Sequence, residues 1–161
     1  MKKVIMVALC LMSAVVSAGN DDSAARATIE KFVGIDLDAV QTNKAVVVAL
    51  PEQFGMLTNA TVFADNDGRI VQVRCIADCD KNVSIEEAKA KAKDLLGKSC
   101  KRFDAPPAKE LHHETAEYYA EFHVQGNPRY KAVVYADEAR NNNKPLGYRI
   151  VVLTFFIQSI R

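Results

Sequence analysis

The sequence contains no catalytic motif that would identify an enzyme. No serine lies in a G-x-S-x-G turn, and no pair of histidines has the H-E-x-x-H spacing of a zinc protease. The cysteines also lack the paired C-x2-C spacing of structural zinc sites. We therefore expect a non-enzymatic protein that holds neither a cofactor nor a metal.

An excess of charge of one sign is also absent. The chain has 21 Lys and Arg side chains against 20 Asp and Glu side chains. Nucleic-acid binding depends on clustered Lys and Arg that neutralise phosphates, and binding to a membrane surface depends on a basic amphipathic helix. The sequence shows neither feature, so we expect no nucleic-acid partner and no membrane association.

A long apolar run is lacking as well. The run over residues 4–15 is shorter than the ~20 residues that a membrane-spanning helix needs. It follows Lys2 and Lys3 and precedes Val16-Ser17-Ala18, which is typical of a secretory signal peptide. We expect residues 1–18 to be a signal peptide that is cleaved after Ala18, which predicts a periplasmic or secreted protein.

Cysteine is scarce beyond that segment, where Cys75, Cys79 and Cys100 remain. In an oxidising compartment an odd number predicts one disulfide and one leftover thiol. A disulfide needs Cα atoms within about 7 Å. Cys75 and Cys79 meet this limit if they lie in a turn, whereas a helix over residues 84–97 would carry Cys100 to the far end of the sheet. We predict a Cys75–Cys79 disulfide.

What the sequence does contain is a hairpin pattern that occurs twice. The segment Val62-Phe63-Ala64-Asp65 is matched by Val134-Tyr135-Ala136-Asp137, and Arg69-Ile70-Val71 is matched by Arg149-Ile150-Val151. Each copy predicts a β-hairpin around a polar turn.

A helix is predicted before each hairpin. Apolar residues recur at helical spacing from Ala25 to Val33, and Gly34 is placed to end that helix. Ser84 and Glu87 form the capping-box pattern that starts a second helix, which Gly97 is expected to end.

Six strands complete the predicted fold. Apolar, β-branched and alternating stretches place them at residues 45–50, 59–65, 69–76, 115–124, 129–137 and 147–158. The predicted fold class is α+β, with two tandem α-β-β-β units at residues 19–80 and 81–161. Their strands form an antiparallel sheet with the helices packed on one face.

This order of elements and hairpins resembles secreted PepSY-type domains and proteins like the β-lactamase inhibitor protein. The resemblance covers nearly the whole chain after the signal peptide, and it carries over no functional residue. It implies a non-enzymatic inhibitor or binding module that offers one face of its sheet to a protein.

The strand periodicity selects the candidate binding residues. If the helices cover the side that bears Val73, Tyr118 and Leu153, the opposite side gathers aromatic side chains with charged neighbours. Surfaces of this kind concentrate partner binding. The predicted partner-binding residues are Phe63, Tyr119, Tyr135, Tyr148, Phe156, Glu121 and Lys131.

Two alternatives to a protein-binding module remain open. A metal-dependent envelope enzyme would use the segment His112, His113 and Glu114, where two histidines and a carboxylate are adjacent. A structural envelope protein would instead bury the same sheet face against a second copy of the chain, as a homodimer.

Overall fold

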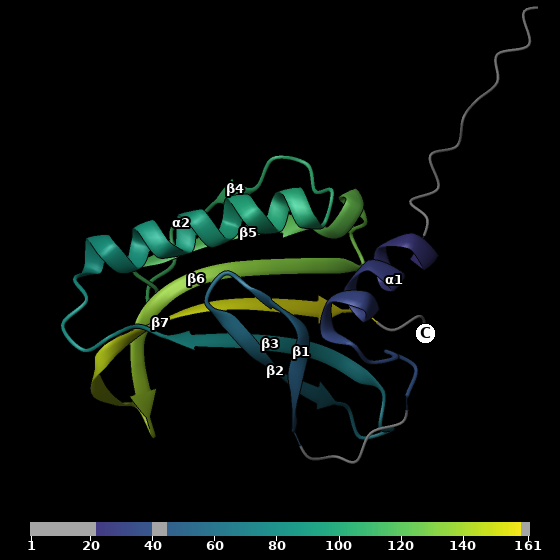
Figure 1. Cartoon of the computed structure of the whole chain (residues 1–161), viewed down its shortest axis with the longest axis horizontal. Helices are drawn as coiled ribbons and strands as arrows, with labels where there is room; N and C mark the ends of the chain where they lie inside the picture. The colour runs from purple at the N-terminus through teal and green to yellow at the C-terminus, as the bar shows by residue number, and fades with distance from the viewer. Residues whose placement is uncertain (1–21, 40–44, 159–161) are drawn as a thin grey trace, which may run out of the picture.

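The computed structural model describes residues 22–39 and 45–158 of the chain. The helices are α1 (Asp22–Val33) and α2 (Ile85–Arg102). The strands and the short 3-10 helix are β1 (Val46–Phe54), β2 (Leu57–Ala64), β3 (Ile70–Asp78), β4 (Lys109–Glu110), β5 (Tyr118–His123), η1 (Val124–Gly126), β6 (Tyr130–Asn141) and β7 (Lys144–Ile157). The predicted α+β class is confirmed (Figure 1). The predicted signal peptide lies outside the described residues.

The seven strands of the described residues form one antiparallel sheet in the order β1-β2-β3-β7-β6-β5-β4. The last strand before α2 therefore pairs with the last strand of the chain, because β3 and β7 are neighbours in the middle of the sheet. A helix followed by three long strands occurs as α1-β1-β2-β3 and again as α2-β5-β6-β7, with the short β4 in the second run. That the two runs repeat one unit, with a boundary at residue 80, stays a prediction.

Helix α1 buries the predicted stripe, which consists of Ala25, Ile29, Phe32 and Val33. Gly34 follows it with a φ of 72°, and its amide donates to the Glu30 carbonyl over 2.8 Å. This is the glycine stop that the sequence predicts.

Helix α2 begins with the predicted capping box. The Glu87 amide donates to the Ser84 hydroxyl over 3.2 Å, and the Ser84 amide donates to the Glu87 carboxylate over 2.9 Å. The expected end at Gly97 is wrong, because the helix continues to Arg102 and the amide of Phe103 closes its last turn on the Ser99 carbonyl. Neither described helix is long and apolar enough to cross a membrane.

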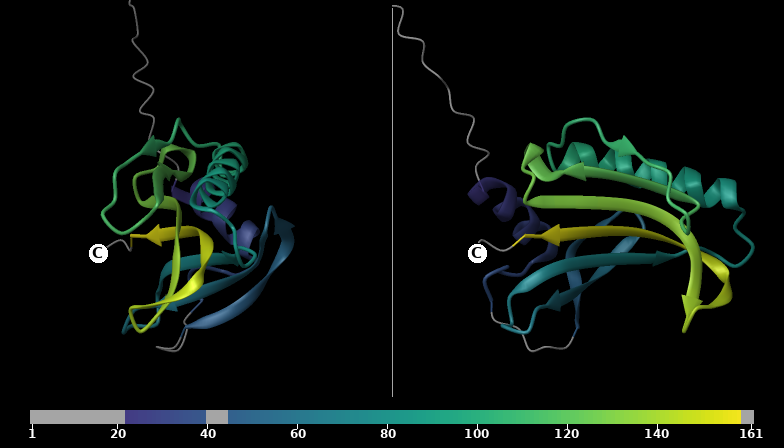
Figure 2. Two further views of the ribbon diagram at one scale, coloured as in Figure 1. Left: turned by 90° about the vertical axis from the view of Figure 1, so that its left-hand side faces the viewer. Right: turned by 180° about the vertical axis from the view of Figure 1, so that it is seen from behind.

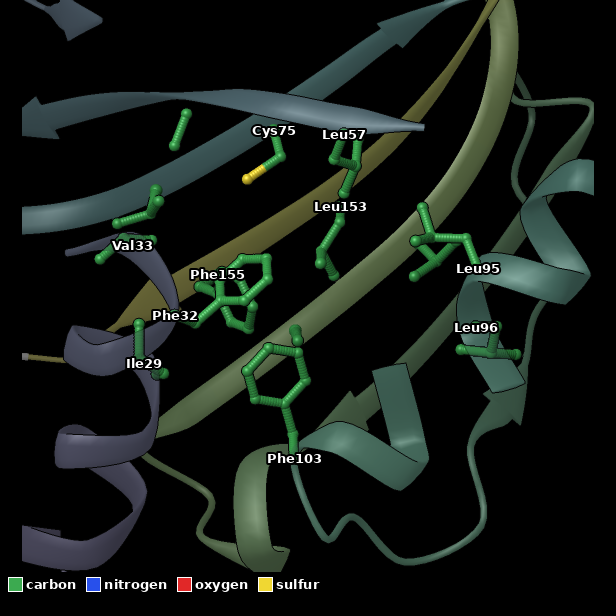
Figure 3. Close-up of a cluster of buried hydrophobic side chains, with 14 of the residues drawn as sticks. Ile29, Phe32, Val33, Leu57, Cys75, Leu95, Leu96, Phe103, Leu153 and Phe155 are labelled. Atoms are coloured by element: carbon green, nitrogen blue, oxygen red, sulfur yellow. The ribbon is translucent and has the colours of Figure 1, made fainter. Parts of the chain in front are cut away.

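Both helices cover the same face of the twisted sheet (Figures 1 and 2). Their apolar stripes pack on buried residues of the central strands, among them Val73, Val151 and Leu153. A cluster of aromatic rings joins the two helices, with Phe103 in contact with both Phe32 and Phe155 (Figure 3). One continuous core therefore lies between the helices and the sheet.

Four strand predictions need correction. The strand predicted at residues 115–124 is shorter, since β5 begins only at Tyr118. β1 runs through Pro51, which an edge strand tolerates because its outer amides have no partner in the sheet. β6 and β7 are longer than predicted, since they pair as far as Asn141 and Lys144. The connecting Asn142 and Asn143 both have positive φ, which suits a two-residue hairpin turn. The two-residue β4 has no counterpart among the predicted strands.

The predicted Cys75–Cys79 disulfide is wrong, since both residues are free and buried cysteines. β3 extends to Asp78, and the Cys79 amide continues the ladder by donating to the Arg149 carbonyl over 2.8 Å. Four residues of extended strand separate Cα atoms by ~13 Å, well beyond the reach of a disulfide. Burial raises the pKa of the Cys75 thiol to about 12, so this thiol stays protonated at neutral pH.

Candidate protein-binding face

The sheet face opposite the helices, here called the outer face, is built from transverse rows of side chains. The strand registers define three rows, each named after one member. The Phe63 row contains Phe63, Gln72, Phe156, Lys131 and His123. The Arg74 row contains Val47, Thr61, Arg74, Thr154, Val133 and Glu121. The Tyr135 row contains Ile76, Val152, Tyr135 and Tyr119.

Strand alternation decides which side chains reach this face. In β3, Val73 and Cys75 are fully buried under the helices, whereas Ile76 is 43% exposed. In β5, Tyr118 is buried, while its neighbour Tyr119 is half-buried on the outer face. The face assignment that the sequence predicted is therefore correct.

Six of the seven predicted partner-binding residues belong to the three rows, and only Tyr148 does not. Tyr148 lies four residues before Val152 on β7, which places it ~13 Å from the Tyr135 row along the strand. It therefore stands at the margin of the outer face.

The Phe63 row carries an electrostatic network. The Lys131 ammonium lies 3.7 Å from the Glu121 carboxylate and 5.5 Å from the centroid of the Phe156 ring. Phe156 is 38% exposed, so its ring presents an apolar surface beside a charged pair. At the other end of the row, the Arg74 guanidinium lies over the Phe63 ring at 5.3 Å from its centroid.

The centre of the outer face is tightly packed. Val133, Val152 and Thr154 are at most 2% exposed, although no helix covers them. Burial raises the pKa of the neighbouring Tyr135 phenol, and the charge of Arg74 partly opposes this rise. The Tyr135 phenol is therefore neutral at neutral pH.

The segment that a metal-dependent enzyme would use, His112 to Glu114, lies beside this face. His112 and Glu114 are exposed, and the His113 ring stacks on Tyr119 with a centroid distance of 4.9 Å. His123 lies four residues further along β5 than Tyr119, or ~13 Å. Across residues 22–39 and 45–158, no group of three or more His, Cys, Asp or Glu side chains is placed to hold a metal ion.

A cleft of about 550 Å³ lies beside α1 at the ends of β3 and β7. Two of its arginines already have acidic partners, since Arg26 pairs with Glu30 and Arg129 pairs with Asp22. The third arginine of the lining, Arg69, shares it with Asp38 and Asp67, so charges of both signs face the cleft.

Sequence reasoning missed Arg74, Thr61 and Thr154, which occupy the middle of the outer face. The alternation of residues in β3 could have placed Arg74 on the outer face, because Arg74 lies between the inward-facing Val73 and Cys75. No family model, no curated protein and no solved structure matches the chain. The resemblance to PepSY-type domains stays a prediction.

Proposed function

We propose that the protein is a non-enzymatic module of the periplasm or of the secreted fraction that binds another protein through its outer face. The observation that carries this proposal is the outer face itself, with aromatic side chains in two of its rows and charged groups between them. Both helices lie on the opposite face, so neither helix covers these rows (Figure 2). An inhibitor or an immunity-type protein would act in this way, by masking a surface of its target.

We expect Tyr119→Ala and Tyr135→Ala each to weaken partner binding by about 1–3 kcal/mol, because half-exposed aromatic anchors often dominate interfaces. The partner is first captured from envelope extract with the wild-type chain and identified by mass spectrometry. Its affinity for each purified variant is then measured by calorimetry. Circular dichroism checks that both variants keep the fold.

Two control variants accompany this test. Ile85→Ala removes a side chain that is 41% exposed on α2, so it should leave affinity unchanged. Tyr118→Ala removes a buried side chain whose hydroxyl donates to Glu110 over 2.9 Å, so it should lower stability. Wild-type affinity in both outer-face variants would exclude this face as the binding surface.

The free edge of β1 favours a second candidate function, which is self-association. Among the described residues β1 has a neighbour on one side only, and its first half, Val46 to Ala49, carries no charge. Val47 is 68% exposed. Long apolar edges pair readily with other strands, whereas the opposite edge, β4, is short and charged. A structural envelope protein would use β1 to build a homodimer.

For this second candidate we expect Val47→Lys to convert dimers to monomers, because a lysine on an edge strand opposes pairing. Sedimentation velocity on the wild-type chain and the variant measures the change. Thr58→Lys adds the same charge to the neighbouring β2, where Thr58 is exposed, and should leave the dimer intact. A wild-type chain that sediments as a monomer at high concentration would rule out the candidate.

A further inference from the structure

Arg74 differs from the other arginines of comparable burial. The described residues contain four half-buried arginines, Arg26, Arg74, Arg129 and Arg149. Arg26 pairs with Glu30, Arg129 with Asp22 and Arg149 with Glu117. No described carboxylate lies within ion-pair distance of Arg74.

The polar groups around Arg74 are also unsatisfied. Its Nε is buried and finds no hydrogen-bond partner within the described ranges, and the same is true of the Thr154 hydroxyl. Thr154 is 2% exposed and lies directly opposite Arg74 in the register of β3 and β7. Thr61 lies opposite Arg74 on the other side, in β2. Two threonines therefore flank Arg74 in the sheet, and the Nε of its guanidinium donates to no acceptor of the described residues.

The acids of the outer face do not compensate this charge. Glu121 belongs to the same row, but three strand spacings separate it from Arg74, or ~14 Å. It already pairs with Lys131. Asp78 lies four residues further along β3, or ~13 Å away. At these separations neither carboxylate lies within ion-pair distance of Arg74.

We infer that Arg74 receives a carboxylate, an Asp or Glu side chain, from the protein that docks on the outer face. A guanidinium offers donors in a planar fork that matches a carboxylate, and the hydroxyl of the half-buried Thr61 adds a further donor. The rows on either side carry Phe63, Phe156, Tyr119 and Tyr135, so the acid arrives within an apolar surface. A small free anion would leave those rings uncovered. This inference rests on the proposed function and names the chemistry of the partner.

The test is an NMR titration of the wild-type chain with two short peptides that differ at one position. The probes are acetyl-Leu-Asp-Phe-amide and acetyl-Leu-Asn-Phe-amide. We expect the Asp peptide to shift the Arg74 Nε–H and Thr154 resonances and to bind about tenfold more tightly than the Asn peptide, because a charge-assisted hydrogen bond to guanidinium is lost in the latter. Arg74→Gln should abolish this tenfold preference.

The matched control is Arg140→Gln, which removes an exposed arginine near the β6–β7 turn and should keep the preference. Amide spectra of both variants check that the fold is intact. Equal binding of the two peptides at Tyr119 and Tyr135 would overturn the carboxylate inference and leave the proposed function standing.

Acetate serves as a third probe, because it is a carboxylate without apolar neighbours. An acetate affinity equal to that of the Asp peptide would make Arg74 a site for small anions and overturn the inference. Absence of any shift at Arg74 with all three probes would overturn it as well. In that case the proposed function is tested separately, by measuring the affinity of Tyr119→Ala and Tyr135→Ala for the captured partner.

Discussion

Phe103→Ala is expected to lower the free energy of unfolding by about 3–5 kcal/mol, the range for removing a large aromatic side chain from a packed core. Phe103 is fully buried at the end of α2. Small domains are stable by only ~5–15 kcal/mol, so this single change removes a large part of the total.

The size of the effect follows from the position of Phe103 among the other rings. Its ring lies 5.0 Å from Phe155, 5.2 Å from Phe32, 6.2 Å from Phe122 and 6.4 Å from Phe54, measured between centroids. These four rings come from β7, α1, β5 and β1. The Phe103 carbonyl also accepts a hydrogen bond from the Gln125 amide over 2.9 Å. A cavity at this point would separate elements from both halves of the chain.

Urea unfolding of the wild-type chain and of Phe103→Ala measures the difference. Phe156→Ala is the matched control, because this phenylalanine lies on the outer face and is 38% exposed. We expect the control to cost less than about 1 kcal/mol, as surface substitutions usually do. Equal losses in the two variants would contradict the assignment of Phe103 as the centre of the core.

The sequence predicted the fold class because its local signals agree with the tertiary structure. The stripe on α1 and the capping box of α2 are local, and both are present as predicted. Alternation in β5 then separates Tyr118 from Tyr119, which assigns the faces of that strand correctly. Period-two patterns of this kind fix a face whenever one side is buried.

The errors arose where a local signal was overruled by tertiary packing or by strand pairing. Gly97 resembles a helix stop, yet α2 continues because Ser99 and Phe103, beyond the glycine, are fully buried. Cys75 and Cys79 were placed in a turn, whereas pairing with β7 keeps that segment extended. Local sequence patterns do not indicate which distant residues a segment packs against or pairs with. The end of α2 and the extended segment from Cys75 to Cys79 therefore do not follow from the sequence alone.

The candidate site was predicted in outline and missed at its centre. Aromatic side chains drew attention to Tyr119 and Tyr135, which the structure places side by side on β5 and β6. Arg74 drew none, because an arginine in a strand is ordinary until its neighbours are known. Its significance depends on the absence of an ion-pair partner within the described residues, and that is a property of the whole sheet. The sequence therefore indicates the face, and the structure adds the charge at its middle.

Gly34→Ala is expected to lower the free energy of unfolding by about 2–4 kcal/mol, because it combines backbone strain with a steric clash. Gly34 has a φ of 72°, a conformation that costs a residue with a side chain ~1–3 kcal/mol. A Cβ added at this position would lie 2.7 Å from Cγ and 3.2 Å from Cδ of Pro51. Both atoms belong to a rigid ring on β1, so they cannot move aside as the end of a flexible side chain would.

Gly97→Ala is the matched control for this substitution and should have the opposite sign. Gly97 lies inside α2, and no atom would come within 4 Å of an added Cβ. Alanine is favoured over glycine inside a helix by ~0.5–1 kcal/mol, so this variant should be more stable than the wild-type chain.

The double variant Gly34→Ala, Pro51→Ala separates the steric clash from the backbone strain, because removal of the Pro51 ring relieves the clash and leaves the strain. We expect Gly34→Ala to cost ~1–3 kcal/mol less in the Pro51→Ala background than in the wild-type background. An equal cost in both backgrounds would show that an added Cβ does not clash with the Pro51 ring. The positive φ alone would then make glycine necessary at the end of α1.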